Sequence, residues 1–223
     1  MARVNDASVR VLLVDDDPLV RSGLRLILDG ADDVRVVGEA ADGDEVPDAV
    51  AASQPHVVLM DLRMPRVDGL AATERVRGRT GAPEVLVLTT FDADEHVLRA
   101  LEGGASGFLL KDTPPEAIVD AIRTVAAGEA ALSPSVARRL IAHVADDESA
   151  ECRNDATARL ARLTDREHEV ALAVGQGSSN AEIADDLAMS VATVKANITR
   201  ILAKLGVDNR VQVALLVHEA RGR

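Results

Sequence analysis

Acidic, hydroxyl and basic side chains stand directly after short apolar runs in the first half of the chain. "LLVDDDP" places three consecutive carboxylates at Asp15–Asp17, and "VVLMDLRMP" ends an apolar run in Asp61. Thr89 follows "VLVL" and Lys111 follows "GFLL". An isolated carboxylate is costly to bury, and neighbouring carboxylates repel each other unless a cation neutralises them. These residue types predict a cation-dependent site wherever the fold brings them together.

The chemistry of such a site follows from its ligands. Carboxylate oxygens in a hard site favour Mg²⁺, which would keep Asp61 ionised and neutralise incoming phosphate oxygens. Lys111 offers a second cation, and the hydroxyl of Thr89 can donate to a phosphate oxygen. This set suits phosphoryl transfer to an aspartate nucleophile. The alternative is that Asp15–Asp17 form a solvated turn and that Lys111 is an ordinary surface lysine.

The elements that position these residues alternate along the chain. Short aliphatic runs are separated by stretches with helical spacing; the runs are residues 9–14, 34–40, 56–60, 84–88 and 107–110. Near-continuous apolar strands between helices indicate a parallel sheet covered on both faces. We therefore predict an α/β, doubly wound, five-stranded parallel sheet. In such a sheet functional groups gather at the carboxyl ends of the strands.

The domain organisation follows from composition. The chain has 223 residues, 47% of them hydrophobic and 28% charged, which indicates globular domains with apolar cores. Residues 1–130 form the predicted α/β domain. Residues 131–158 are predicted as a linker, with a helix that starts near Ser133 and a flexible acidic stretch at 145–158. Residues 159–223 are predicted to be all helical.

The compartment is predicted to be the cytoplasm. The single cysteine, Cys152, forms no disulfide framework and no zinc finger. The N-terminal residues lack the apolar core of a signal peptide because acidic residues interrupt it. No apolar run approaches the length of a membrane span, so no membrane association is expected.

The helical half carries clear helix starts. "TDRE" at 164–167 and "SNAE" at 179–182 are capping boxes. Ser190 caps a third helix, which Gly206 ends. Because only a short turn separates the second and third helices, the pattern predicts a helix-turn-helix.

The charge distribution favours DNA binding by the third helix. The net charge is −12, but residues 158–223 carry nine Lys and Arg against eight Asp and Glu, a net +1. The run 190–206 contains no acidic residue. One of its faces repeats apolar residues, and the opposite face is predicted to carry cations and short polar groups suited to phosphates and base edges. The predicted DNA-binding residues are Thr193, Lys195, Asn197, Arg200 and Lys204. The alternative is a solvated surface of a helical bundle.

Taken in order, these motifs resemble a known family. "LLVDDDPLVRSGL", "VLMDLRMPRVDGL", "VLVLTTFD" and "GASGFLLKDTPPEAIVDAI" resemble the flavodoxin-like receiver domain of two-component response regulators. The segment from "LTDREHEV" to "VQVALL" resembles the LuxR-type DNA-binding domain. Together they resemble the NarL/FixJ family of transcriptional regulators. The resemblance implies a sensor histidine kinase as partner, double-stranded DNA as target and a homodimer when phosphorylated.

The resemblance also implies roles for individual residues. Asp61 would accept the phosphoryl group, and Mg²⁺ would be held by Asp15, Asp16, Asp61 and the main-chain carbonyl of Arg63. Thr89 and Lys111 would contact the phosphoryl group, and an inward turn of Phe108 would report phosphorylation. The final helix would support dimer contacts on DNA, with simple bundle packing as the alternative.

The chain departs from the family pattern at several positions. Phe108 stands where many receivers have Tyr, and Asn197 where many relatives have His. Asp17 adds a third acid, which either tunes metal affinity or faces solvent. Asn197 leaves the base preference open, because Asn can pair with adenine or reach a phosphate.

Two other functions compete with a phosphorylation-controlled regulator. Phosphohydrolases also combine an aspartate nucleophile with Mg²⁺ and Lys, but they need a general acid two residues after the nucleophile. That position is Arg63, which does not readily donate a proton. A DNA-binding protein that no longer accepts phosphate would be expected to lack parts of the set Asp15, Asp16, Asp61, Thr89 and Lys111, which is complete here.

Overall fold

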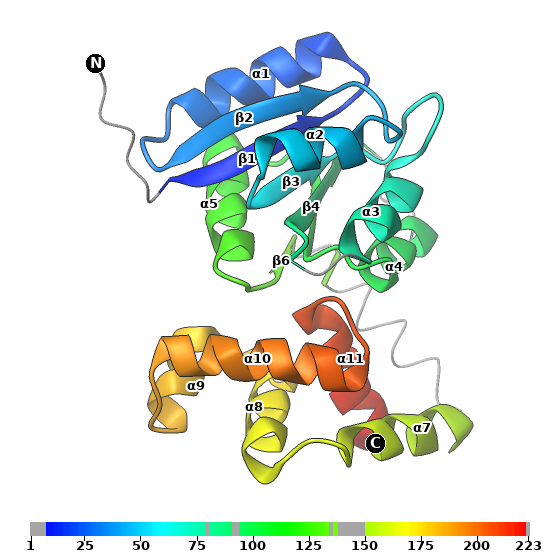
Figure 1. The fold of residues 1–223 in the computed structure, drawn as a ribbon, viewed down its shortest axis with the longest axis vertical. Helices are drawn as coiled ribbons and strands as arrows, with labels where there is room; N and C mark the ends of the chain where they lie inside the picture. Colours follow the sequence, from blue (N-terminus) through cyan, green and yellow to red (C-terminus); the bar gives the residue numbers. More distant parts are fainter. Residues whose placement is uncertain (1–7, 79–80, 91–93, 134–135, 138–149, 222–223) are drawn as a thin grey trace. The chain divides into compact units, whose positions relative to one another are not determined.

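The computed structural model describes residues 8–78, 81–90, 94–133, 136–137 and 150–221. The chain divides into two compact units (Figure 1). The first unit comprises Met1–Ala127 and Ala131–Ser133, and the second comprises Gly128–Ala130 and Pro134–Arg223. Each unit has its own apolar core.

The first unit is built on one parallel sheet. Its strands are β1 (Val9–Val14), β2 (Val34–Ala40), β3 (Val57–Met60), β4 (Glu84–Thr89), β5 (Gly107–Leu110) and β6 (Ala131–Leu132). Their order is β2-β1-β3-β4-β5-β6, and every neighbouring pair is parallel. The prediction of five strands was wrong by one. β6 has only two residues, too few to show a periodic pattern, and it lies in the segment that was predicted as linker.

Helices cover both faces of this sheet, which confirms the doubly wound α/β prediction (Figure 1). They are α1 (Pro18–Asp29), α2 (Val46–Ser53), α3 (Gly69–Arg77), α4 (Asp94–Glu102) and α5 (Pro115–Ala126). Residues of α1 and α5 share a core with one side of the strands, including Leu13, Leu59 and Leu88. Alternate strand residues, such as Val87 and Phe108, face the opposite side and are fully buried. The sheet is therefore apolar on both faces.

Helix α1 begins at a capping residue that is recognisable in the sequence. The same helix exposes two leucine side chains to solvent. Asp17 is its N-cap, and its carboxylate accepts a hydrogen bond from the Leu19 amide at 2.8 Å. Pro18 occupies the first turn. Leu19 and Leu26, seven residues apart on one face, are 79% and 78% exposed. Gly23 lies between them, and nothing approaches the place where its Cβ would stand.

The second unit is all helical, as predicted. Its described helices are α7 (Ala150–Leu160), α8 (Asp165–Gly175), α9 (Asn180–Asp186), α10 (Val191–Leu205) and α11 (Arg210–Arg221). Both predicted capping boxes form, at Thr164 with Glu167 and at Ser179 with Glu182. Gly206 ends α10 with a φ of 64°, in the left-handed region that favours glycine. No helix among the described residues has the length and apolar character needed to cross a membrane.

The region predicted as a linker differs from the expectation. Helix α7 covers residues 150–160, so the prediction of a flexible stretch over 145–158 was wrong for residues 150–158. Ala156 and Leu160 pack into the core of the second unit, which explains why a charge-rich segment is helical here. Residues 145–149 lie outside the described residues. Of the helix predicted to begin near Ser133, only residues 136–137 are described, and both are helical.

Candidate functional site

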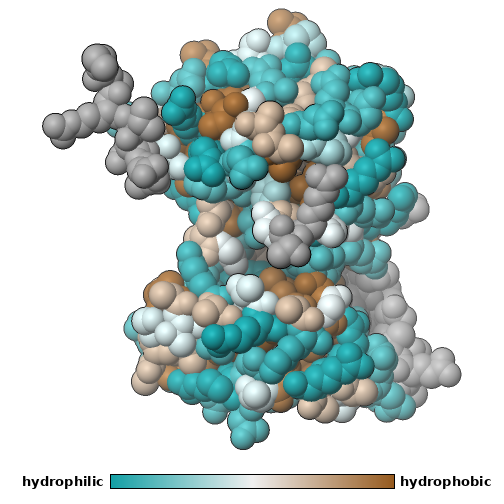
Figure 2. All heavy atoms as spheres, in the orientation of Figure 1, coloured by the Kyte–Doolittle hydropathy of each residue, from teal (hydrophilic) through white to brown (hydrophobic). Residues whose placement is uncertain are grey.

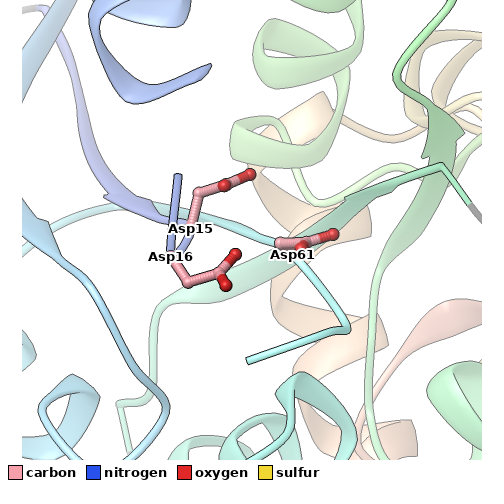
Figure 3. A group of neighbouring side chains, drawn as sticks. All are labelled: Asp15, Asp16 and Asp61. Atoms are coloured by element: carbon pink, nitrogen blue, oxygen red, sulfur yellow. The ribbon is translucent and has the colours of Figure 1, made fainter. Parts of the chain in front are cut away.

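The acidic residues meet at the point where the chain's path through the sheet reverses. From β1 the chain runs to β2 on one side and then to β3 on the other, which opens a crevice at the carboxyl ends of β1 and β3. Asp15 and Asp16 follow β1, and Asp61 follows β3. Figure 3 shows the three side chains near one another, with their carboxylates extending in the same direction in this view. Carboxylate oxygens of the three residues lie within 4.8 Å of one another.

Lys111 supplies the positive charge at this point. It follows β5, and its Nζ lies 2.6 Å from Oδ2 of Asp15 and 3.4 Å from Oδ2 of Asp61. The other oxygen of Asp15 accepts a hydrogen bond from the Asp17 amide at 2.9 Å. Asp15 is therefore held on two sides, and the ammonium group of Lys111 lies between carboxylates from two different strands.

Asp61 is the carboxylate with unused bonding capacity. It is 5% exposed, and its Oδ1 is buried with no hydrogen-bond partner among the residues that the structure describes. Burial and the negative charge of Asp15 raise the pKa of Asp61, against the opposing effect of Lys111. Burial alone would lower the pKa of Lys111, but its contacts with Asp15 and Asp61 raise it overall. An added cation beside Asp61 would offset the cost of its charge.

The donor set fits Mg²⁺. A hard cation that keeps several waters suits this place, which offers three carboxylates, a nearby opening to solvent and one buried oxygen without a partner in the described part of the chain. The opening is a cavity of about 440 Å³ beside Asp16. Its lining residues are Asp16, Leu62, Arg63, Met64, Pro65, Asp68, Leu70, His96 and Arg99. Arg63, whose carbonyl the family resemblance implies as a ligand, thus lies in the loop that borders both the cavity and Asp61.

Thr89 and Phe108 lie on neighbouring strands. Thr89 is the last residue of β4 rather than the first after it, and it is fully buried. In the β4–β5 register Val87 pairs with Phe108 and Thr89 pairs with Leu110. Paired residues in adjacent strands point to the same face, so the side chains of Thr89 and Phe108 share one face of the sheet. That face is opposite to the one that α1 and α5 cover.

Four of the five predicted DNA-binding residues are exposed in the second unit, and Asn197 is buried. Helix α10 follows α9 after the turn at residues 187–190, which matches the helix-turn-helix prediction. Thr193, Lys195 and Arg200 are exposed on α10. Neither Lys195 nor Arg200 has an ion-pair partner within the described part of the chain. The face of this unit seen in Figure 2 mixes hydrophilic residues with weakly hydrophobic and strongly hydrophobic ones.

Asn197 and Lys204 make contacts within the unit that the sequence analysis did not predict. Asn197 is 6% exposed, and its side-chain amide donates to the Thr193 carbonyl at 2.9 Å. Its prediction as part of the exposed face was wrong, because it lies at the edge of the buried stripe beside Ile198. Lys204 lies 2.6 Å from a carboxylate oxygen of Glu167. It was predicted as a DNA contact, but its ammonium group is engaged in an ion pair within the unit.

This ion pair is expected to make the second unit sensitive to acid. The hydrogen bond from Lys204, with those from Thr164, lowers the pKa of Glu167 from about 4.5 to about 2. A depressed carboxyl pKa stabilises the fold above pH 4.5, and that stability is lost as pH falls toward 2. We expect Glu167→Gln to cost roughly 1–2 kcal/mol at neutral pH, discounted because Lys204 is partly exposed, and little at pH 2. Denaturant unfolding followed by circular dichroism at several pH values measures this difference.

The matched control for this prediction is Glu169→Gln. Glu169 pairs with Arg166 on the surface, where both side chains are about half exposed. We expect that variant to unfold like the wild type at every pH. If Glu167→Gln lost the same free energy of unfolding at pH 2 as at pH 7, its charge would not be the source of the effect.

The sequence analysis did not predict the helix cap formed by Asp17 or the ion pair between Glu167 and Lys204. Asp17 is exposed, as the second of the two alternatives offered for it had it, and its carboxylate also caps α1, a role that the sequence analysis did not name. The Asp-Pro pair at the start of an apolar helical pattern was a usable signal for that cap. Glu167 and Lys204 are 37 residues apart, and no spacing rule connects them.

Comparisons with known proteins agree with this arrangement. Residues 11–123 match the family described as "Response regulator receiver domain", and residues 161–217 match "Bacterial regulatory proteins, luxR family". The transcriptional regulatory protein LiaR of Bacillus subtilis is 37% identical over 94% of this chain and 97% of its own length. The nitrate/nitrite response regulator NarL of Escherichia coli is 32% identical over 97% of this chain and 98% of its own.

Solved structures give the same result. The response regulator ChrA of a heme-sensing two-component system is 40% identical, with a TM-score of 0.53, over 96% of this chain and 98% of its own. A structure of RcsB dimers bound to DNA is 25% identical, with a TM-score of 0.55, over 95% of this chain and 98% of its own. The NarL/FixJ family consists of phosphorylation-controlled transcriptional regulators that join a receiver domain to a LuxR-type DNA-binding domain. Because the present chain has both domains in this order and has full-length relatives among them, it belongs to the NarL/FixJ family of two-component response regulators.

Proposed function

We propose that Asp61 accepts a phosphoryl group from a sensor histidine kinase. The observation that carries this proposal is the buried Oδ1 of Asp61, which has no hydrogen-bond partner among the described residues and lies beside Lys111 and two further carboxylates. An oxygen of Asp61 forms a bond to phosphorus as the phosphorus–nitrogen bond of the kinase phosphohistidine breaks, and the imidazole nitrogen keeps the electron pair. The family assignment favours this reaction over phosphohydrolase activity.

The residues around Asp61 support the transfer in different ways. Asp15, Asp16, Asp61 and the main-chain carbonyl of Arg63 would hold Mg²⁺, directly or through water. The bound ion supplies positive charge that neutralises the phosphate oxygens and keeps Asp61 ionised. Lys111 would leave its contact with Asp61 to pair with a phosphate oxygen, and the hydroxyl of Thr89 would donate to another.

The response to phosphate runs through the shared face of β4 and β5. A Thr89 hydroxyl drawn toward the phosphoryl group changes the space available on the face that Phe108 occupies. Phe108 is fully buried, so its rearrangement must repack its neighbours. If one arrangement of the domain binds the phosphoryl group better than the other, phosphorylation shifts the equilibrium between the two arrangements toward the better-binding one. We propose that this arrangement favours a homodimer, as RcsB forms on DNA.

The exposed cations of α10 would then meet DNA. Lys195 and Arg200 suit phosphate contacts, and Thr193 stands beside them near the start of the helix. Lys204 and Asn197 are left out of the proposed contact set, because one is ion-paired and the other is buried. We propose that the protein acts in the cytoplasm, because its proposed target is DNA.

A phosphodonor assay tests the proposal. With Mg²⁺ and acetyl phosphate the full chain is expected to gain one phosphoryl group by intact mass, labile at high pH as an acyl phosphate is. The same treatment is expected to raise the light-scattering mass and the affinity for a selected DNA site. A protein that gains no mass at any Mg²⁺ concentration would contradict the receiver role of this site.

Thr89→Ala tests the coupling separately from the chemistry. Because Asp61 and Lys111 remain, the variant is expected to gain the phosphoryl group, more slowly than the wild type. Its phosphate-driven change in oligomeric mass and DNA affinity is expected to fall several-fold, since the hydroxyl that moves with the phosphate is missing. Thr73→Ala is the control: Thr73 is also fully buried, but its hydroxyl donates to Gly69 within α3. Wild-type switching in Thr89→Ala would remove Thr89 from the mechanism.

A further inference from the structure

The loop from Asp61 to Gly69 carries the phosphoacceptor and the Arg63 carbonyl. Its last residue, Gly69, packs against the backbone of its first residues, Asp61 and Leu62. The Gly69 amide donates to the Leu62 carbonyl at 2.9 Å. A Cβ at Gly69 would stand 2.0 Å from the Asp61 carbonyl oxygen, so no other residue fits without moving that backbone. These contacts hold the two ends of the loop together, but they do not fix the residues in its middle.

That support comes from Asp42, in the loop between β2 and α2. Asp42 is 2% exposed. Its Oδ2 accepts from the Arg66 amide at 2.9 Å and its Oδ1 from the Val67 amide at 2.9 Å. One carboxylate thus binds two successive amides of a loop 24 residues further along the chain. Hydrogen bonds from main-chain amides to a carboxylate are among the stronger kinds in proteins.

The neighbouring glycine brings the two loops together. The Gly43 amide donates to the Val67 carbonyl at 3.2 Å, and a Cβ at Gly43 would stand 2.4 Å from that carbonyl oxygen. The Arg66 side chain closes the contact from outside, with ion pairs to Asp42, Asp44 and Glu45 at 3.5, 3.0 and 2.7 Å. Burial alone would raise the pKa of Asp42, but the amides of Arg66, Val67 and Asp44 lower it to about 2, so the carboxylate stays charged at neutral pH.

We propose that Asp42 is a positioning residue for the Mg²⁺-dependent phosphorylation site, acting through the backbone of Arg66 and Val67. The proposal rests on the function proposed above for Asp61. Mg²⁺ demands near-ideal octahedral geometry, so ligands carried by a loop must be held in place. Asp42 fixes residues 66 and 67, which follow Arg63 in the loop, and Gly69 fixes the end of the loop against Asp61 and Leu62. Asp42 itself touches neither the ion nor the phosphoryl group.

Mg²⁺ binding by the full chain, without a phosphodonor, gives the readout. Isothermal titration of Asp42→Ala and Asp42→Asn at neutral pH is expected to show Mg²⁺ affinity weakened about tenfold in the alanine variant and less in the asparagine variant, which keeps one acceptor oxygen. At saturating Mg²⁺ both variants are expected to gain one phosphoryl group from acetyl phosphate, because Asp61 and Lys111 are unchanged.

Asp44→Asn is the matched control. Asp44 lies in the same loop and pairs with the same Arg66, but its carboxylate accepts no main-chain hydrogen bond from residues 61–69 among the described contacts. Its Mg²⁺ affinity is expected to equal that of the wild type. Gly43→Ala disturbs the same contact from the other side and is expected to weaken Mg²⁺ as Asp42→Asn does. It keeps the proposal testable if Asp42→Ala does not fold.

The outcomes separate this inference from the proposed function. Variants with lowered thermal stability but wild-type Mg²⁺ affinity would overturn the positioning role and leave Asp42 as a structural brace. If the wild type binds Mg²⁺ but gains no phosphoryl group, the function proposed for Asp61 fails, and the titrations still decide the role of Asp42 in ion binding.

Discussion

Asp61→Asn is expected to abolish phosphoryl gain entirely. The asparagine amide is nearly isosteric with the carboxylate but lacks the nucleophilic charge, so acetyl phosphate and Mg²⁺ should leave the mass of the variant unchanged. Loss of the charge also removes one of the two carboxylates that contact Lys111. DNA affinity should then be the same with and without phosphodonor. Intact mass spectrometry and a DNA titration on the same samples measure both effects.

The variant is expected to fold at least as well as the wild type. Burial raises the pKa of Asp61, so removing its charge relieves a cost in the absence of Mg²⁺. Thermal melting therefore serves as the control for folding. Asp29→Asn, at the exposed end of α1, controls for loss of a carboxylate elsewhere and should gain one phosphoryl group. Equal phosphoryl gain in Asp61→Asn and the wild type would mean that another residue accepts the group.

The Lys195→Ala, Arg200→Ala double variant is expected to lose most DNA binding. Each cation that contacts a phosphate contributes about one unit to the slope of log affinity against log salt. A dimer would lose about four such contacts, so the slope should fall by about 4 and affinity should drop on the order of 100-fold at moderate salt. The loss should be similar on a selected site and on random DNA, because phosphate contacts carry no sequence information.

The control for this variant removes the same charge from the first unit. Arg35→Ala, Arg75→Ala takes away two exposed cations of β2 and α3 and should leave the salt slope unchanged. The second unit of the Lys195, Arg200 variant should keep its helical content, since both side chains are exposed and unpaired among the described residues. A wild-type slope in that variant would show that α10 is not the element that meets DNA.

The positions of Asp15, Asp61, Thr89 and Lys111 were predictable because each stands at the end of an apolar strand or directly after it. Parallel strands place such residues at one edge whatever the details of packing. The capped helices of the second unit were predictable for a similar reason, because a capping box is a local pattern. Neither inference needed any knowledge of which residues lie far apart in the sequence but close in space.

Two of the features that were missed, the Glu167–Lys204 ion pair and the contacts of Asp42, depend on residues that are distant in the sequence. Lys204 is a cation on a helix without acids, and only the fold shows that Glu167, 37 residues earlier, holds it. Asn197 sits at the boundary between the buried and exposed faces of α10, where helical spacing does not decide the side. Asp42 precedes a glycine and looks like an ordinary turn residue. Its role depends on amides 24 and 25 residues away.

The exposed leucines of α1 bear on the colloidal behaviour of the protein. At neutral pH a net charge of −12 keeps molecules apart by mutual repulsion. The isoelectric point is about 4.8, and there this repulsion vanishes while Leu19 and Leu26 remain in water. Acidification toward the low pKa of Glu167 passes through this pH, where the solubility is expected to be lowest. Acid unfolding of this chain is therefore best followed in dilute samples, each prepared directly at its final pH.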